Sequence, residues 1–206
     1  AIPSVSADPS HGADVRRAAE WVVARIRQAG GEAGVVDWHG SPLAIGEVRA
    51  SRAAESAPTI LCYAHFDVQP PDPLELWESA PFELTERDGW LYARGVADDK
   101  AHLFMLLDAC ESLAAAGELP VNVRFACDGE EETGGESIVQ WLEQDERGAD
   151  AAIVLDGMML RRDVPAVEIG LRGVCYFHVT VRTGERDLHS GMYGGVALNA
   201  LHALNR

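Results

Sequence analysis

The chain has 206 residues, of which 47% are hydrophobic and 24% charged, a composition that allows a packed core and argues against disorder. The formal net charge of −16 argues against nucleic acid or an anionic membrane as partner, because both are bound through lysine and arginine. Most of the 33 acidic residues fit a solubilising surface, and a smaller group of them could converge on cations.

In chain order, the first predicted element is a helix over residues 12–29, where apolar residues recur at steps of three and four until Gly30-Gly31. Residues 59–64 form a nearly continuous β-forming run, typical of a strand buried on both faces. Further along, the patterns predict an irregular loop over 71–89, a short strand and turn over 90–96, a helix over 100–116, a strand over 121–127, a helix over 136–146 and a buried strand over 151–155. This alternation predicts an α/β fold with a mostly parallel sheet sandwiched by helices.

The pattern changes after residue 165. Two strand-like runs, 166–172 and 174–182, follow each other without a helix between them, and a helix is predicted over 196–206. We therefore place a domain boundary near Gly173, with one domain over 1–173 and the start of an α+β domain over 174–206.

The cysteines form no Cys-x-x-Cys pair, which excludes a cysteine zinc finger. All four lie among apolar neighbours and are expected to be buried, reduced thiols: Cys62, Cys110, Cys127 and Cys175. The segment Ala1–Ser4 lacks the features of a signal peptide, and no run of 18 apolar residues suggests a membrane helix. We therefore expect a cytoplasmic protein, and the absence of an initiator Met suggests that its natural start precedes Ala1.

Side chains that can bind metals follow four predicted strands. They are His65 and Asp67 after 59–64, Asp98 and Asp99 after 90–96, Glu130, Glu131 and Glu132 after 121–127, and Asp156 after 151–155. Taken singly, each has a common structural explanation, such as a helix cap, a solvated loop or a turn. Together they predict a site beyond the carboxyl ends of the strands, where imidazole and carboxylates suit zinc, manganese or cobalt. Two divalent ions about 3.5–4 Å apart would neutralise the acids and activate a water molecule.

Five short motifs, in order, resemble those of the M20 metallopeptidase family, which includes dipeptidases and N-acyl amino acid deacylases. Residues 65–70 read His-Phe-Asp-Val-Gln-Pro, 94–100 read Arg-Gly-Val-Ala-Asp-Asp-Lys, and 131–135 read Glu-Glu-Thr-Gly-Gly. Residues 170–173 resemble the family's domain-junction signature, and 187–195 resemble its lid signature. The resemblance implies an incomplete catalytic metallopeptidase domain over 1–173 and a truncated lid or dimerisation domain over 174–206.

The resemblance also implies the ligands of two divalent metals, with zinc preferred over manganese or cobalt. His65 and Asp156 would bind the first ion, Glu132 would bind the second, and Asp98 would bridge them. The Asp98–Asp99 peptide bond would be cis. In the family, a further histidine completes the second site from a segment that lies beyond Arg206 in this numbering.

The same resemblance implies three residues that assist the reaction. Glu131 would be the general base, although Glu130 stays open as an alternative because three glutamates run together. Asp67 would orient His65 through its second ring nitrogen. His189 would donate a hydrogen bond to the oxyanion, in the family often across a homodimer formed through the lid.

The function implied is metal-dependent hydrolysis of the amide bond in dipeptides or small peptides. An Asp at position 156 is typical of the family's dipeptidases, whereas Glu is typical of its carboxypeptidases and several deacylases. The alternatives are an N-acyl amino acid deacylase or carboxypeptidase of the same family, or a non-catalytic fragment.

Overall fold

The computed structural model describes residues 1–170 and 172–205, so Leu171, within the predicted strand 166–172, and Arg206 lie outside the described residues. The chain forms two compact units, Ala1–Met158 and Met159–Arg206. They are described separately, and the boundary predicted near Gly173 stays a prediction.

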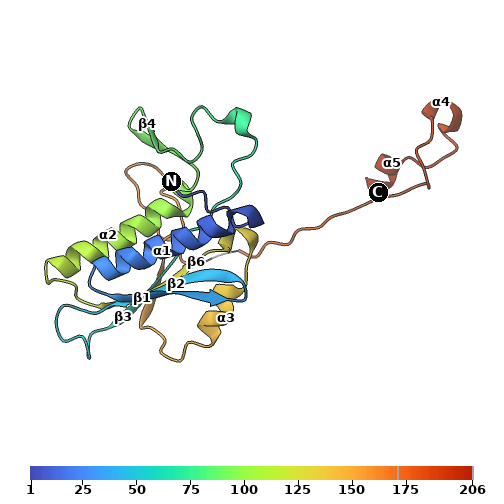
Figure 1. The fold of residues 1–206 in the computed structure, drawn as a ribbon. Coiled ribbons are helices and arrows are strands. Elements are labelled where there is room, and N and C mark those ends of the chain that lie inside the picture. The colour runs from blue at the N-terminus through green and yellow to red at the C-terminus, as the bar shows by residue number, and fades with distance from the viewer. Residues whose placement is uncertain (171, 206) are drawn as a thin grey trace. The chain divides into compact units, whose positions relative to one another are not determined.

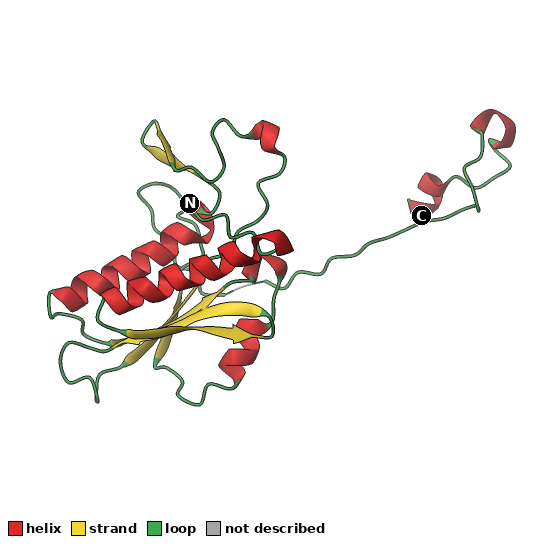
Figure 2. Ribbon diagram, in the orientation of Figure 1, coloured by secondary structure: helices red, strands yellow, loops and turns green. Residues whose placement is uncertain are grey.

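The first unit is a layered α/β structure (Figures 1 and 2). Its five-stranded sheet has the order β1-β2-β6-β3-β7. The strands are β1 (Glu32–Trp38), β2 (Ser41–Val48), β3 (Thr59–His65), β6 (Asn122–Asp128) and β7 (Ala151–Val154). Helices α1 (Gly12–Gln28) and α2 (Ala101–Ala115) cover one face, and α3 (Ser137–Glu143) lies on the other. The predicted α/β class is thus confirmed.

The sheet is mixed rather than mostly parallel. β3 pairs in parallel with both β6 and β7, as the alternation of strands and helices predicts. The hairpin of β1 and β2, however, is antiparallel, and β2 joins β6 in antiparallel register. The antiparallel half comes from a segment for which the sequence analysis predicted no element.

Two apolar cores lie on opposite faces of the sheet. Successive side chains of a strand point to opposite faces, so in β6 Phe125 packs with α1 and α2 while Ala126 packs with Ile138 of α3. The larger core contains Val22 and Ile26 of α1, both completely buried. These cores hold β3 and β6, two adjacent interior strands, and thereby fix where both strands end.

The predicted strand over 90–96 does not join this sheet. Only β5 (Trp90–Tyr92) forms, and it pairs with β4 (Thr85–Arg87) in a separate two-stranded hairpin. A helical turn, Val96–Lys100, then leads directly into α2. The strand predicted over 151–155 is also less buried than expected, because β7 lies at the sheet edge and all four of its residues are exposed.

The second unit holds two short helices, α4 (Ser190–Tyr193) and α5 (Ala200–Leu204). Its described residues form neither predicted strand, because no neighbouring strand pairs with the backbone of 166–170 or 172–182. Cys175 is exposed there, so its predicted burial is wrong, whereas Cys62, Cys110 and Cys127 are buried and free. None of the helices in the described part of the chain is both long enough and apolar enough to cross a membrane.

Candidate metal centre

The carboxyl ends of three strands meet at one edge of the first unit's sheet. The last residue of β3, His65, pairs with the last residue of β6, Asp128. On the other side of β3, Tyr63 pairs with Val154, the last residue of β7. Because these pairings are parallel, the segments that carry Asp67, the glutamates and Asp156 leave the sheet at the same edge.

The turn before α2 supplies Asp98 to this edge. It begins after Gly95, whose φ of +85° is in the left-handed region that favours glycine. A β-carbon at Gly95 would also lie 2.7 Å from a methyl group of Val68. Inside the turn, Asp98 has an extended backbone, and the predicted cis bond between Asp98 and Asp99 is confirmed. The turn places the Asp98 side chain at the end of β3, within 2.9 Å of His65 Nε2.

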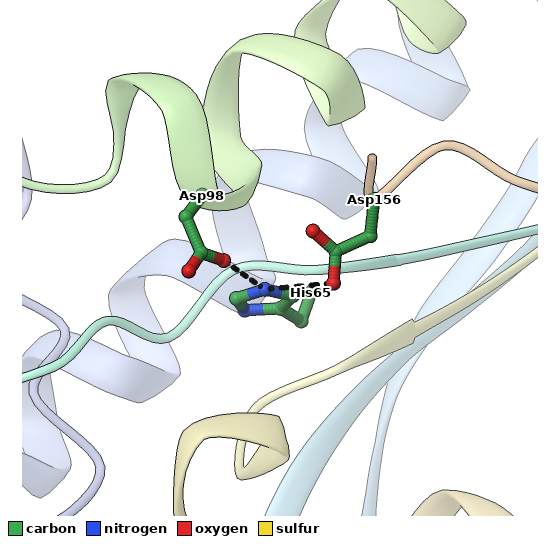
Figure 3. A group of neighbouring side chains, drawn as sticks. All are labelled: His65, Asp98 and Asp156. Atoms are coloured by element: carbon green, nitrogen blue, oxygen red, sulfur yellow. Dashed lines mark hydrogen bonds and ion pairs between the residues drawn. The ribbon is translucent and has the colours of Figure 1, made fainter. Parts of the chain in front are cut away.

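His65 is the centre of the cluster. Its Nε2 lies 2.9 Å from Asp98 Oδ1 and 3.7 Å from Asp156 Oδ2 (Figure 3). Glu131 Oε2 is slightly farther from the same nitrogen, at 3.9 Å. One possible ligand atom from each of His65, Asp98 and Asp156 lies within 4.8 Å of the others. Three segments that are distant in sequence therefore bring possible metal-ligand atoms into one small volume.

The other ring nitrogen of His65 faces Asp67. His65 Nδ1 lies 3.2 Å from Asp67 Oδ1, and both side chains are completely buried. The second oxygen of this carboxylate accepts hydrogen bonds from Ser6 Oγ at 2.6 Å and from the Glu132 backbone at 3.1 Å. Asp67 therefore fixes the orientation of the imidazole and leaves Nε2 directed at the carboxylates.

The electrostatics of the cluster favour a cation. Burial opposes a charge on the imidazole, but the hydrogen bond to Asp67 and the neighbouring carboxylates outweigh it and raise the pKa of His65 to about 10. Burial and the adjacent acids also raise the pKa of the Glu131 carboxyl, against the opposing charge of His65. The carboxylates that stabilise a positive charge on the imidazole would also stabilise a divalent ion that replaces the proton at Nε2, so these residues fit a metal.

The carboxylates of the two remaining glutamates form hydrogen bonds with other partners. The carboxylate of Glu132 accepts hydrogen bonds from the backbone and side chain of Gln69, at 3.2 and 2.9 Å. The carboxylate of Glu130 instead accepts from the backbone N–H of Ser137 at the start of α3, at 2.8 Å. Of the three glutamates, only Glu131 forms an ion pair with His65 in the described structure.

His189, the third predicted catalytic residue, belongs to the second unit. It caps the start of α4, where its Nδ1 accepts a hydrogen bond from the backbone of Gly191 at 3.1 Å. Its proposed role in the reaction therefore stays a prediction.

Asp99, which the sequence analysis counts among the side chains that can bind metals, lies beside the cluster together with His102. Asp99 is completely buried; its carboxylate accepts from the backbone of His65 at 3.1 Å and lies 2.8 Å from His102 Nδ1. With Asp156, this pair forms a second group of possible ligands. The spacing of three residues between Asp99 and His102 places both on one face of a helix start, which is a signal that the sequence contained.

The chain matches a known family over most of its length. The family described as Peptidase family M20/M25/M40 matches residues 61–198. Beta-Ala-His dipeptidase of Rattus norvegicus is 36% identical over 144 residues, which are 68% of this chain and 29% of that protein. Cys-Gly metallodipeptidase of Schizosaccharomyces pombe is 34% identical over 210 residues, or 94% of this chain and 44% of that protein.

A solved structure agrees with the sequence relatives. The M20 family metallo-carboxypeptidase of Sulfolobus solfataricus has 31% sequence identity and a TM-score of 0.68, and the match covers 77% of this chain and 35% of that one. The chain thus spans less than half the length of these relatives.

Proposed function

Since the chain belongs to the M20/M25/M40 peptidase family, we propose that it carries a two-metal centre that hydrolyses the amide bond of dipeptides or small peptides. The observation that carries this proposal is the convergence of His65, Asp98 and Asp156 on one volume. The relatives named as dipeptidases, one for Beta-Ala-His and one for Cys-Gly, support a small substrate with two residues.

We assign the first metal to His65, Asp98 and Asp156, and the second to Asp98 and Glu132 with a histidine outside this chain. Zinc fits this donor set, and manganese or cobalt would also suit it. Divalent ions held by these residues would supply polarisation of the scissile carbonyl and activation of water for attack. Glu132, whose carboxylate accepts a hydrogen bond from Gln69 in this structure, would hold the second ion.

The chain's own residues then orient the reactants and move protons. Asp67 keeps the Nδ1 of His65 engaged, so that Nε2 stays free as a donor atom. Glu131, beside the His65 ring, takes a proton from the attacking water and passes it to the leaving amine. His189 donates to the oxygen that becomes negative as the carbonyl is attacked.

The test is amide hydrolysis by the full-length protein that carries this chain. Cleavage of β-Ala-His or Cys-Gly should be lost after chelation and restored by zinc or manganese. Glu131→Gln should lower kcat by about 10²- to 10⁴-fold with its metal content unchanged. Glu130→Gln is the matched control, because it removes the neighbouring carboxylate and should retain most of the activity. Normal turnover by Glu131→Gln would contradict the assignment of the base.

A second candidate function for the same metal centre is that of a carboxypeptidase or an N-acyl amino acid deacylase. The carboxypeptidase from Sulfolobus solfataricus, similar in fold and sequence, supports it. A panel of free-amino dipeptides against N-acetyl and N-succinyl amino acids separates the two. If the full-length protein holds no stoichiometric divalent metal, a non-catalytic role is favoured instead.

We also propose a homodimer formed through residues 174–206 and a cytoplasmic location. The three buried free thiols are compatible with a reducing compartment. Size-exclusion chromatography with light scattering tests the dimer, and fractionation of the source cells tests the location.

A further inference from the structure

Residues 2–6 run beside the loop that follows β3. Val5 forms a parallel bridge with Val68, and the Val68 backbone donates to the Ser4 carbonyl at 2.9 Å. The Ser4 side chain is completely buried, and its hydroxyl donates to the Phe66 carbonyl at 2.5 Å. This short segment is therefore attached to the two residues that flank Asp67.

Lys100 attaches the same segment to the turn that carries Asp98. Its ammonium group donates to the Ile2 carbonyl at 2.6 Å and to the Ser4 hydroxyl at 2.7 Å. Because Lys100 ends the turn Val96–Lys100, these bonds hold residues 2–4 against the start of α2. Residues 2–6 are thus joined to two of the segments that bring candidate ligands.

Ser6 makes the contact nearest to the cluster. Its hydroxyl donates to Asp67 Oδ2 at 2.6 Å, a short bond of the kind formed with a charged acceptor. The same oxygen accepts from the Glu132 backbone, and the other oxygen of Asp67 faces His65 Nδ1. The hydroxyl of Ser6 therefore holds in place a buried carboxylate that both orients His65 and anchors the backbone of Glu132.

We propose that Ser6 is a positioning residue of the metal centre, acting on His65 and Glu132 through Asp67. This inference rests on the proposed two-metal function. Without the hydroxyl, Asp67 Oδ2 keeps the Glu132 backbone as its single donor among the described residues, and the carboxylate can rotate about its side-chain bonds or take up water. The His65 imidazole and the Glu132 segment are then no longer held by the same fixed carboxylate. The free energy needed to order them when metal binds lowers the affinity for metal.

The experiment measures metal binding by the full-length protein without using turnover. Zinc affinity is determined by competition with a chromophoric chelator, and the visible spectrum of the cobalt-loaded protein reports ligand geometry. Ser6→Ala should bind zinc about 3- to 10-fold more weakly, less than the about 10- to 100-fold typical of losing the direct partner of a ligand. Ser6→Thr, which keeps the hydroxyl, should bind within about twofold of the wild type and show its cobalt spectrum.

Two further variants separate positioning from general stability. Ser6→Cys keeps the size of the side chain but donates weakly, so it should behave as Ser6→Ala does, and it carries the test if the alanine variant fails to fold. Ser56→Ala removes a hydroxyl that donates to the Ala53 carbonyl at an exposed site, and it should leave zinc affinity unchanged. Thermal unfolding of the metal-free proteins shows whether each variant is folded.

The outcomes are distinct. If the wild type binds zinc and both Ser6→Ala and Ser6→Cys bind it equally well, the role of Ser6 is refuted and the proposed function stands. A change in unfolding temperature without a change in affinity or cobalt spectrum likewise refutes it, because Ser6 would then serve the fold alone. If the wild type binds no divalent metal, the proposed function and this inference both fail.

Discussion

Replacing Asp67 by Asn tests how the cluster holds its imidazole. The two side chains have nearly the same shape, but Asn has one acceptor oxygen where Asp has two. Asp67 uses both oxygens: Oδ1 faces His65 Nδ1, and Oδ2 accepts from Ser6 and from the Glu132 backbone. If the amide oxygen faces His65, the amide NH₂ points at the Glu132 N–H and that donor is left without an acceptor. If the amide is turned round, the NH₂ faces Nδ1 and forces the proton onto Nε2, the atom proposed to bind the metal.

Either arrangement loses one hydrogen bond to a charged group inside the protein, worth about 1.5–3 kcal/mol. At about 1.4 kcal/mol per factor of ten, this corresponds to a metal affinity about 10- to 100-fold weaker, in the range expected for the partner of a metal-binding histidine. Competition with a chelator at constant pH measures the zinc affinity of the variant and of the wild type. Asp37→Asn, which removes an exposed carboxylate paired with Arg16, is the charge-matched control and should leave affinity unchanged. A loss below about threefold in Asp67→Asn would refute the role given to this carboxylate.

Three other results are expected. Arg124→Met should lower the free energy of unfolding by about 2–3 kcal/mol in urea titrations, because buried Arg124 donates to both oxygens of Asp145 at 2.8 and 2.7 Å and to the Gly148 carbonyl at 2.6 Å. The hydrogen bond from Arg124 lowers the pKa of Asp145. The stabilisation is therefore present above the ordinary pKa of a carboxyl group and is lost as the pH falls through the lowered pKa of Asp145. The difference in unfolding free energy between Arg124→Met and the wild type should shrink below about pH 4. Gly129→Ala should destabilise the fold by about 1–3 kcal/mol and weaken zinc binding, since its β-carbon would lie 2.7 Å from the Pro42 carbonyl and 2.9 Å from the Phe66 ring; unchanged melting and affinity would contradict this. Zinc at 100 times its Kd should raise the free energy of unfolding by about 2.7 kcal/mol, seen by calorimetry as a rise in melting temperature that a chelator reverses, and no rise would argue against a site formed only in the folded state.

The central elements of the fold could be predicted because their apolar patterns are local. The helices α1 and α2 and the strands β3 and β6 all form close to the ranges expected. The hairpin of β1 and β2 was missed because its turn is His39-Gly40, which lacks the usual Asn-Gly signal although both residues have positive φ, +49° and +98°. The runs at 166–172 and 174–182 have the alternation of strands, but alternation does not supply the neighbouring strand that a ladder requires.

The candidate site was predictable in part for the same reason. His65 ends β3 and Asp156 follows β7, two strands that pair in parallel, so chain order alone brings both residues to one edge. Asp98 is also predicted at a strand end, after 90–96, but that segment does not join the sheet, and Asp98 reaches the edge through the turn Val96–Lys100 before α2. The bond from Ser6 to Asp67 joins residues 61 positions apart, and no local pattern in the sequence marks such a contact.

The exposed strand β7 has a practical consequence for anyone producing these 206 residues alone. Among the described residues it pairs with β3 on one side, while the other side presents free backbone donors and acceptors beside the exposed Ile153, Val154 and Leu155. Such an edge can recruit a second copy of itself and propagate into insoluble assemblies. Ile153→Lys is expected to reduce this assembly, because a charged side chain on an edge strand opposes pairing with a second copy, and position 153 is not a candidate ligand.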